Sequence, residues 1–178
     1  MNGITLRPIE TADAAALADL QSAVFDDYER SKLLAEVIEQ ERAARSASLG
    51  TDVPAPFGLA AYHEDTLVGW SQGYRQGKTE FYMLNSGVAS TERRKGVYSA
   101  LVAAILNHAK TEGYAKVTSR HAASNNAVLI AKMRLGFQVS GFEYSEVYGP
   151  LVQLTYIVNE TRRRLYRMRS ASIRSSAQ

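Results

Sequence analysis

The sequence predicts an α/β (α+β) fold, with a mixed, mostly antiparallel central sheet of about seven strands and about four flanking helices. Two hairpin patterns predict the antiparallel part, one over residues 57–62 and 67–74 and one over 137–147 and 151–158. A strand over 79–88, a helix and a strand over 114–119 predict one parallel pair, because a helix of that length returns the chain in the same direction.

Length and composition indicate one soluble domain. The chain has 178 residues, 46% hydrophobic and 22% charged. It contains no cysteine, which excludes disulfides and thiolate chemistry and is compatible with a reducing cytoplasm. It has no apolar run long enough for a bilayer and no export signal, so we expect a cytoplasmic protein without membrane association. Its three histidines lack ligand spacing, so we expect no metal.

The positive charge is concentrated at the C-terminus. Residues 160–178 contain six arginines and one glutamate, which leaves 15 basic and 17 acidic residues in residues 1–159. We therefore expect one domain over 1–159 and a basic tail over 160–178, helical at first and then disordered. The domain itself gives no reason to expect nucleic acid binding.

The first third of the chain predicts one strand and two helices. Residues 4–7 form a short strand, and Thr11 is placed to cap a helix that runs to Val24. A second helix is expected over 31–45. The acidic connection over 26–29 has two interpretations, a solvated loop or a surface that attracts a cationic amine.

The strand over 79–88 alternates in its first part and becomes irregular near its end. Alternation places Glu80, Tyr82, Ser86 and Val88 on one face. The run 85–87 (Asn-Ser-Gly) is poor strand material, so we expect a bulge that leaves backbone N–H groups free, or an early end of the strand.

A basic turn, residues 93–99, follows this strand and begins the crossover helix. Arg93, Arg94 and Lys95 bring three positive charges to a helix N-terminus, which already carries partial positive charge and unpaired N–H groups. Such a turn is suited to an anion, most simply a phosphate or pyrophosphate, and Gly96 lets the anion approach the backbone.

The run Arg93-x-x-Gly96-x-Tyr98 resembles the Arg/Gln-x-x-Gly-x-Gly/Ala signature of the GNAT superfamily, the acyl-CoA-dependent N-acetyltransferases. Tyr98 replaces the final small residue and must face away from a bound diphosphate. A second signature of the family is similar here too: Asn125 leads a helix that ends in Leu-Gly-Phe at residues 135–137. Where the family often has a proton-donating tyrosine, this chain has Lys132.

The resemblance implies acetyl-CoA as co-substrate and a splayed pair of parallel strands that receives its pantetheine arm. The residues it assigns to the cofactor are Ser86, Gly87, Val88, Arg93, Arg94, Lys95, Gly96, Val97, Tyr98, Ser99, Asn125 and Lys132. A free N–H group within residues 86–88 would polarise the thioester carbonyl. The resemblance also suggests a homodimer.

Three residues are candidates for catalysis: Glu80, Tyr82 and His121. Glu80 is either a base acting directly or through water, or an exposed carboxylate at a strand end. His121 has a suitable intrinsic pKa, or is a polar loop residue. Tyr98, Tyr82 or Lys132 could protonate the thiolate, although a thiolate leaves well without an acid.

The predicted function is direct transfer of acetyl from acetyl-CoA to a primary amine of a small molecule or peptide, in a ternary complex. Direct transfer is expected because no cysteine is available to carry the acyl group. Two rival functions are a non-catalytic acyl-CoA sensor on the same fold and a basic-tailed RNA- or ribosome-associated module.

Overall fold

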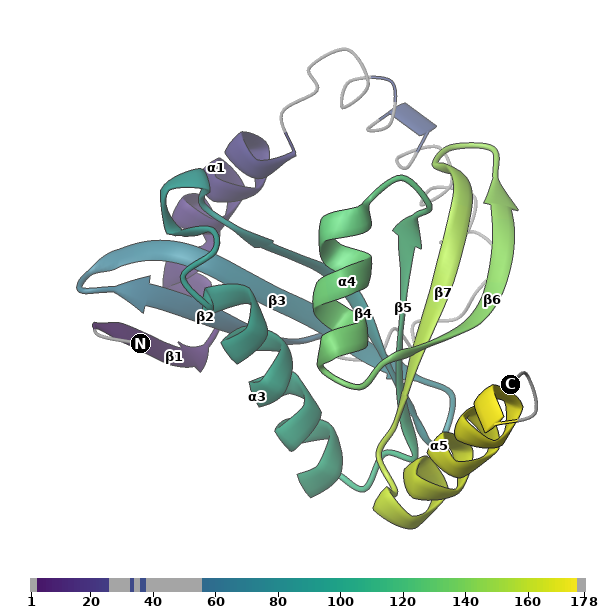
Figure 1. Cartoon of the computed structure of the whole chain (residues 1–178). Helices are drawn as coiled ribbons and strands as arrows, with labels where there is room; N and C mark the ends of the chain where they lie inside the picture. Colours follow the sequence, from purple (N-terminus) through teal and green to yellow (C-terminus); the bar gives the residue numbers. More distant parts are fainter. Residues whose placement is uncertain (1–2, 26–32, 34–35, 38–55, 176–178) are drawn as a thin grey trace.

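The computed structural model describes residues 3–25, 33, 36–37 and 56–175 (Figure 1). The acidic connection over 26–29 lies outside the described residues. Of the predicted helix over 31–45, residues 33, 36 and 37 are described, and each is helical.

Seven strands form one sheet, which confirms the predicted mixed, mostly antiparallel architecture. The sheet order is β1-β2-β3-β4-β5-β7-β6, and β4–β5 is its parallel pair. The strands are β1 (Ile4–Pro8), β2 (Phe57–His63), β3 (Thr66–Gln76), β4 (Glu80–Val88), β5 (Lys116–Ala122), β6 (Gln138–Ser145) and β7 (Gly149–Ile157).

Helices cover both faces of the sheet. In the described residues they are α1 (Ala14–Val24), α3 (Val97–Thr111), α4 (Asn126–Arg134) and α5 (Glu160–Ser175), with 3-10 turns η1 (Thr11–Asp13) and η2 (Ser90–Glu92). Helices α3 and α4 lie in front of the sheet in Figure 1. Helix α1 packs on the opposite face, where Phe25, directly after it, meets Trp70 of β3 edge to face.

The N-terminal corner differs in its cap from the sequence prediction. Thr11 begins η1, and Glu10 is its N-cap: the Glu10 backbone N–H donates to the Asp13 carboxylate at 2.8 Å. Asp13 is buried and also accepts from Arg7 at 2.7 Å and from Tyr62. These hydrogen bonds, led by that from the Glu10 backbone, lower the pKa of Asp13 to about 2.

The main core lies between α3 and the sheet. Val97, Leu101 and Ile105 recur at helical spacing and are buried against β-strand residues such as Phe81. Each such side chain contributes roughly 1.5–3 kcal/mol by leaving water. His108 is half-buried and stacks on Phe57, with ring centroids 3.5 Å apart.

The basic tail begins with helix α5. Helix α5 runs to Ser175 and begins after Asn159, whose side chain accepts from the Arg162 N–H at 3.0 Å. Arg163 anchors the helix by donating to the Ile157 carbonyl at 3.0 Å. None of the helices in the described ranges has the length and apolar content that a membrane crossing requires.

Candidate functional site

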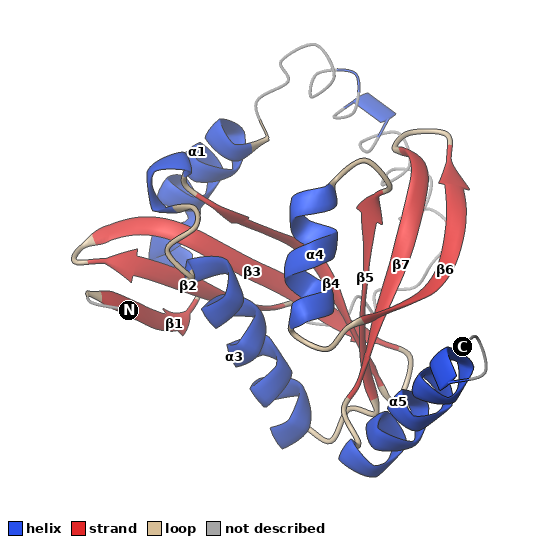
Figure 2. Ribbon diagram, in the orientation of Figure 1, coloured by secondary structure: helices blue, strands red, loops and turns tan. Residues whose placement is uncertain are grey.

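Strands β4 and β5 pair at one end and then separate. In the described residues their pairing runs from Glu80↔Lys116 to Tyr82↔Thr118 and stops. Figure 2 shows the two strands diverging toward their C-terminal ends. We call the part of the sheet beyond Tyr82 and Thr118 the fork. The predicted splayed parallel pair is therefore confirmed.

A bulge in β4 lies within the fork. The β3–β4 register shifts between Gln72↔Asn85 and Gly73↔Met83, which leaves Leu84 as the extra residue. The bulge thus begins just before the predicted stretch 85–87.

The bulge shifts the alternation of side chains by one residue. The prediction that Ser86 and Val88 share a face with Glu80 and Tyr82 is therefore wrong. Ser86 and Val88 turn to the α3 side, where Ser86 contacts the Ser71 hydroxyl at 2.8 Å. Gly87 turns to the α1 side, because a Cβ there would approach Trp70 and Val24.

The basic turn presents unpaired backbone donors. Gly96 is the N-cap of α3 with φ 88°, and Arg94 has φ 63°, both in the left-handed region. The backbone N–H groups of residues 94–99 have no hydrogen-bond acceptor in the described part of the protein. Free donors at a helix N-terminus are suited to an anion.

The three cations of the turn have different roles. The Arg93 Nε donates to the Val88 carbonyl at 3.2 Å, which ties the turn to the end of β4. The Lys95 ammonium pairs with the buried Glu92 at 3.0 Å and lowers the pKa of that carboxyl. Arg94 is exposed and makes no ion pair within the described residues. The Arg94 guanidinium is therefore available to a bound phosphate.

The side chains that begin α3 leave the turn open. Val97 is buried, and Tyr98 packs against the hydrophobic core, where burial raises its pKa. Tyr98 therefore faces away from the turn, as the sequence requires of a large residue at this position. Ser99 is exposed beside the unpaired amides.

The second predicted signature contributes a cap and a buried lysine. The Asn125 side chain accepts from the Val128 N–H at 3.3 Å, so it caps α4. Lys132, two turns further along, is 1% exposed. Its ammonium donates to the Ser119 hydroxyl at 2.8 Å and contacts the Met83 sulfur at 3.2 Å. Burial lowers the pKa of Lys132 to about 7.

His121 lies beside this lysine. Its Nε2 is 3.0 Å from the Ser119 hydroxyl. Burial, and to a lesser degree the charge of Lys132, lowers the pKa of His121 to about 3, so the ring is neutral at physiological pH. Sequence reasoning missed Ser119; the only available signal was its alternation with His121 along one strand.

Glu80 and Tyr82 face the other side of the sheet from His121. The Glu80 carboxylate pairs with Lys116 at 2.6 Å and accepts from Thr118 at 2.5 Å. Burial raises the pKa of Glu80, but these hydrogen bonds outweigh it and the net pKa is lowered. Tyr82 packs on Tyr74, and burial raises its pKa. Their catalytic roles stay predictions.

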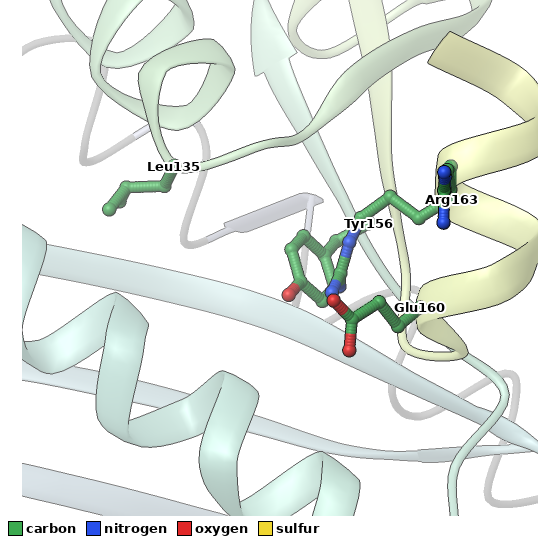
Figure 3. A pocket seen from close by; sticks show the side chains of 5 residues that line it. Leu135, Tyr156, Glu160 and Arg163 are labelled. Carbon is green, nitrogen blue, oxygen red and sulfur yellow. The ribbon is translucent and has the colours of Figure 1, made fainter. Parts of the chain in front are cut away.

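A separate groove of about 300 Å³ lies beside the C-terminal helix. Figure 3 shows that it runs between the end of α4 and the start of α5 and is lined by Leu135, Tyr156, Glu160, Arg163 and Arg164. The Arg163 guanidinium lies 4.6 Å from the centre of the Tyr156 ring. The groove lies at the opposite end of α4 from Asn125 and shares no residue with the basic turn.

Comparisons with known proteins agree with this geometry. The model of the acetyltransferase (GNAT) family matches residues 16–137. A search of curated proteins found no match.

Solved structures share the fold at low identity. The ribosomal-protein-S18-alanine N-acetyltransferase of Escherichia coli is 15% identical with a TM-score of 0.66, over 88% of this chain and 94% of that one. Ard1 from Thermoplasma volcanium is 19% identical with a TM-score of 0.66, over 89% and 99%. A GNAT acetyltransferase from Elizabethkingia anophelis with acetyl-CoA bound is 16% identical with a TM-score of 0.64, over 88% and 99%.

Proposed function

The chain belongs to the GNAT acetyltransferase family, and on that premise we propose that it transfers an acetyl group from acetyl-CoA to a primary amine. The observation that carries the proposal is the row of six amides at residues 94–99, which have no acceptor among the described residues and lie directly beyond the fork between β4 and β5.

The amides would bind the diphosphate of the donor. A helix N-terminus attracts an anion through its dipole and its free N–H groups. The exposed guanidinium of Arg94 adds a charge-assisted contact. Gly96 has no side chain above the turn, so the phosphate oxygens can reach the backbone.

The fork would then receive the pantetheine arm and direct the thioester into the sheet. Beyond Tyr82, β5 no longer pairs with β4, so the backbone of residues 86–88 on that edge is available to the arm. An N–H group of this stretch would donate to the thioester oxygen and stabilise the negative charge that develops there.

The chemistry would be a direct displacement. The neutral amine attacks the thioester carbonyl, the tetrahedral intermediate loses a proton from nitrogen, and the carbon–sulfur bond breaks to release CoA. Because the chain has no cysteine, a thioester-linked acyl-enzyme is excluded, and we expect both substrates to be bound together in a ternary complex. A small-molecule amine and a peptide amine are both acceptor classes to test. A cytoplasmic location and a homodimer stay predictions.

Calorimetry and thiol release test the proposal. We expect acetyl-CoA and CoA to bind with micromolar dissociation constants, and acetyl-CoA with a suitable amine to release free thiol. Binding without thiol release across a broad panel of small amines and peptides would favour the acyl-CoA sensor. Absence of binding for both ligands at millimolar concentration would contradict the proposed function.

A further inference from the structure

The side chain of Lys132, on α4, reaches the narrow end of the fork. Met83 and Ser119 are the first residues of β4 and β5 beyond the last paired residues, and the Lys132 nitrogen contacts both, at 3.2 Å and 2.8 Å. Leu84, the bulge residue, directly follows Met83. A thioester that enters the fork and meets a free N–H group beyond the bulge would therefore approach the amine of Lys132.

The neighbours of Lys132 suit a neutral amine. An ammonium has three N–H donors, whereas a neutral amine has two and a lone pair. Two acceptors contact the nitrogen, the Ser119 hydroxyl and the Met83 sulfur, and the residue is 1% exposed. A neutral amine can donate to both acceptors and keep its lone pair unshared. That lone pair is what a nucleophile uses to attack a carbonyl carbon.

The described residues place no opposite charge on Lys132, since none of their carboxylates forms an ion pair with it. Met83 on β4 is uncharged, and the centre of the Phe137 ring, after α4, is 4.6 Å away. His121 on β5 is neutral, because burial lowers its pKa to about 3. Burial lowers the pKa of Lys132 to about 7, so a large fraction of molecules hold a neutral amine there at neutral pH.

Acetylation of Lys132 would remove a buried charge. A buried ammonium without a counter-ion destabilises the folded protein, whereas an amide is uncharged. The amide also keeps one N–H, which can still donate to the Ser119 hydroxyl. An amide is far less reactive than a thioester, so an acetyl group transferred to this nitrogen would stay on it and would not pass to an acceptor.

We propose that Lys132 is a self-acetylation site, to which the chain transfers the acetyl group of its own bound acetyl-CoA when no acceptor amine is present. The inference rests on the proposed function. The neutral amine attacks the thioester carbonyl, a carbon–nitrogen bond forms, and the carbon–sulfur bond breaks with its electron pair on sulfur. The nitrogen loses one proton and the thiolate gains one, so the products are acetyl-lysine and CoA thiol. The acetyl group then occupies the end of the fork and hinders the next acetyl-CoA.

Peptide mapping by mass spectrometry tests the proposal on the parent chain, without a substitution. The full chain is incubated with acetyl-CoA at pH 8 in the absence of amine, and the acetylated lysines are identified. We expect one acetyl group on Lys132, gained at a fractional rate independent of protein concentration, because a second chain cannot reach a buried nitrogen. Excess CoA should suppress this reaction, whereas acetylation of exposed lysines such as Lys110 should continue.

The pH profile separates the two kinds of lysine. Acetylation of Lys132 should rise between pH 6 and pH 8 and then level off, since its amine is mostly neutral above its pKa of about 7. Acetylation of exposed lysines should continue to rise about tenfold per pH unit toward pH 10, because their pKa is about 10.4. A Lys132 profile that rises in parallel with that of the exposed lysines would mean unassisted chemical modification and would overturn the proposal.

Lys132→Met and Lys110→Met are the matched variants. Lys110→Met should gain the acetyl group at Lys132 as the parent chain does. The acetylated parent chain, freed of CoA, should bind acetyl-CoA about tenfold more weakly than before incubation, because the end of the fork is filled. The same incubation should leave the affinity of Lys132→Met unchanged. If Lys132→Met does not fold, the mapping and the pH profile of the parent chain still decide.

A parent chain that binds acetyl-CoA in calorimetry while Lys132 stays unmodified overturns this proposal alone. A parent chain that binds neither acetyl-CoA nor CoA overturns the proposed function, and this proposal with it.

Discussion

Polar groups near the two ends of β4 differ in whether other parts of the protein bind them. At the paired end, Glu80 is held by Lys116 at 2.6 Å and by Thr118 at 2.5 Å. At the end beyond the fork, the amides of residues 94–99 have no acceptor in the described part of the chain. Lys132, between the two ends, is buried without a carboxylate partner among those residues.

The difference separates polar groups that other parts of the protein satisfy from polar groups that are open to a ligand. The first N–H groups of a helix have no intrahelical acceptor, and residues 94–96 and 99 are exposed, so their amides are open to solvent or to a ligand. At the paired end, the Glu80 carboxylate and the Lys116 ammonium form an ion pair with each other, so no ligand is needed to account for them. The amides beyond the fork are suited to an anionic ligand, and the following variants test this contrast.

The largest expected effect concerns the buried lysine. In the folded protein the pKa of Lys132 is lowered to about 7, so between pH 7 and the pKa of an unfolded lysine, about 10.4, the unfolded chain binds one more proton. The free energy of unfolding should therefore rise with pH in this range, by a few kcal/mol. Urea denaturation at pH 7 and pH 9.5 measures this rise.

The matched variants for this test lie at the fork and at the paired end. Lys132→Met should lose most of the rise, whereas Lys116→Met should retain it. Equal slopes in the parent chain and in Lys132→Met would show that the lysine is not held in its neutral form.

The second effect concerns the close packing behind β4. A Cβ at Gly87 would lie 2.3 Å from the buried Trp70 ring and 2.9 Å from Val24. Gly87→Ala should therefore lower the free energy of unfolding by about 1–3 kcal/mol. At Gly141, on β6, a Cβ would meet Gln153 at an ordinary 3.5 Å, so Gly141→Ala is the control and should change stability little. Similar losses in thermal denaturation of both variants would contradict this account.

A third, smaller effect separates backbone strain from ligand binding. Gly96 and Gly113 both have positive φ, 88° and 74°. Alanine at either position should lower the free energy of unfolding by about 1–2 kcal/mol. Gly96→Ala alone should also weaken acetyl-CoA binding, by about tenfold, because its methyl group and the altered turn disturb the row of amides. Calorimetry on the two variants would refute the contrast if both lost affinity equally.

The smallest effect is expected at the paired end. Glu80→Gln keeps the shape of the side chain and removes its charge. Lys116 is 44% exposed, so losing this ion pair should lower the free energy of unfolding by less than about 1 kcal/mol. The rate of acetyl transfer should stay within threefold, since Glu80 is already engaged. A hundredfold fall in kcat would instead support the role of base that the sequence suggested.

Local patterns were sufficient to predict most of the fold. The alternation and turn residues of the hairpins predicted the antiparallel strands, and the crossover helix predicted the parallel pair, all of which the structure confirms. At the start of α5, an Asn159 cap and an Arg163 contact to β7 add to a weak local preference for helix.

The site was predictable only in part. The basic turn was visible as a cluster of charges, but two of its cations, Arg93 and Lys95, bind other parts of the protein. A one-residue bulge at Leu84 reversed the faces of the residues beyond it, and no local pattern located it to the residue. The Lys132 cluster unites α4, β4 and β5, and such tertiary contacts cannot be read from spacing along the chain.

Amide hydrogen exchange followed by NMR tests the central claim most directly, because the claim concerns individual N–H groups. Without ligand, the amides of residues 94–99 should exchange at nearly unprotected rates, while those of the central strands β3 and β4 are protected. Saturation with CoA should slow the exchange of most of the six by at least tenfold. Protection of these amides before CoA is added, or unchanged exchange when CoA is bound, would contradict the account.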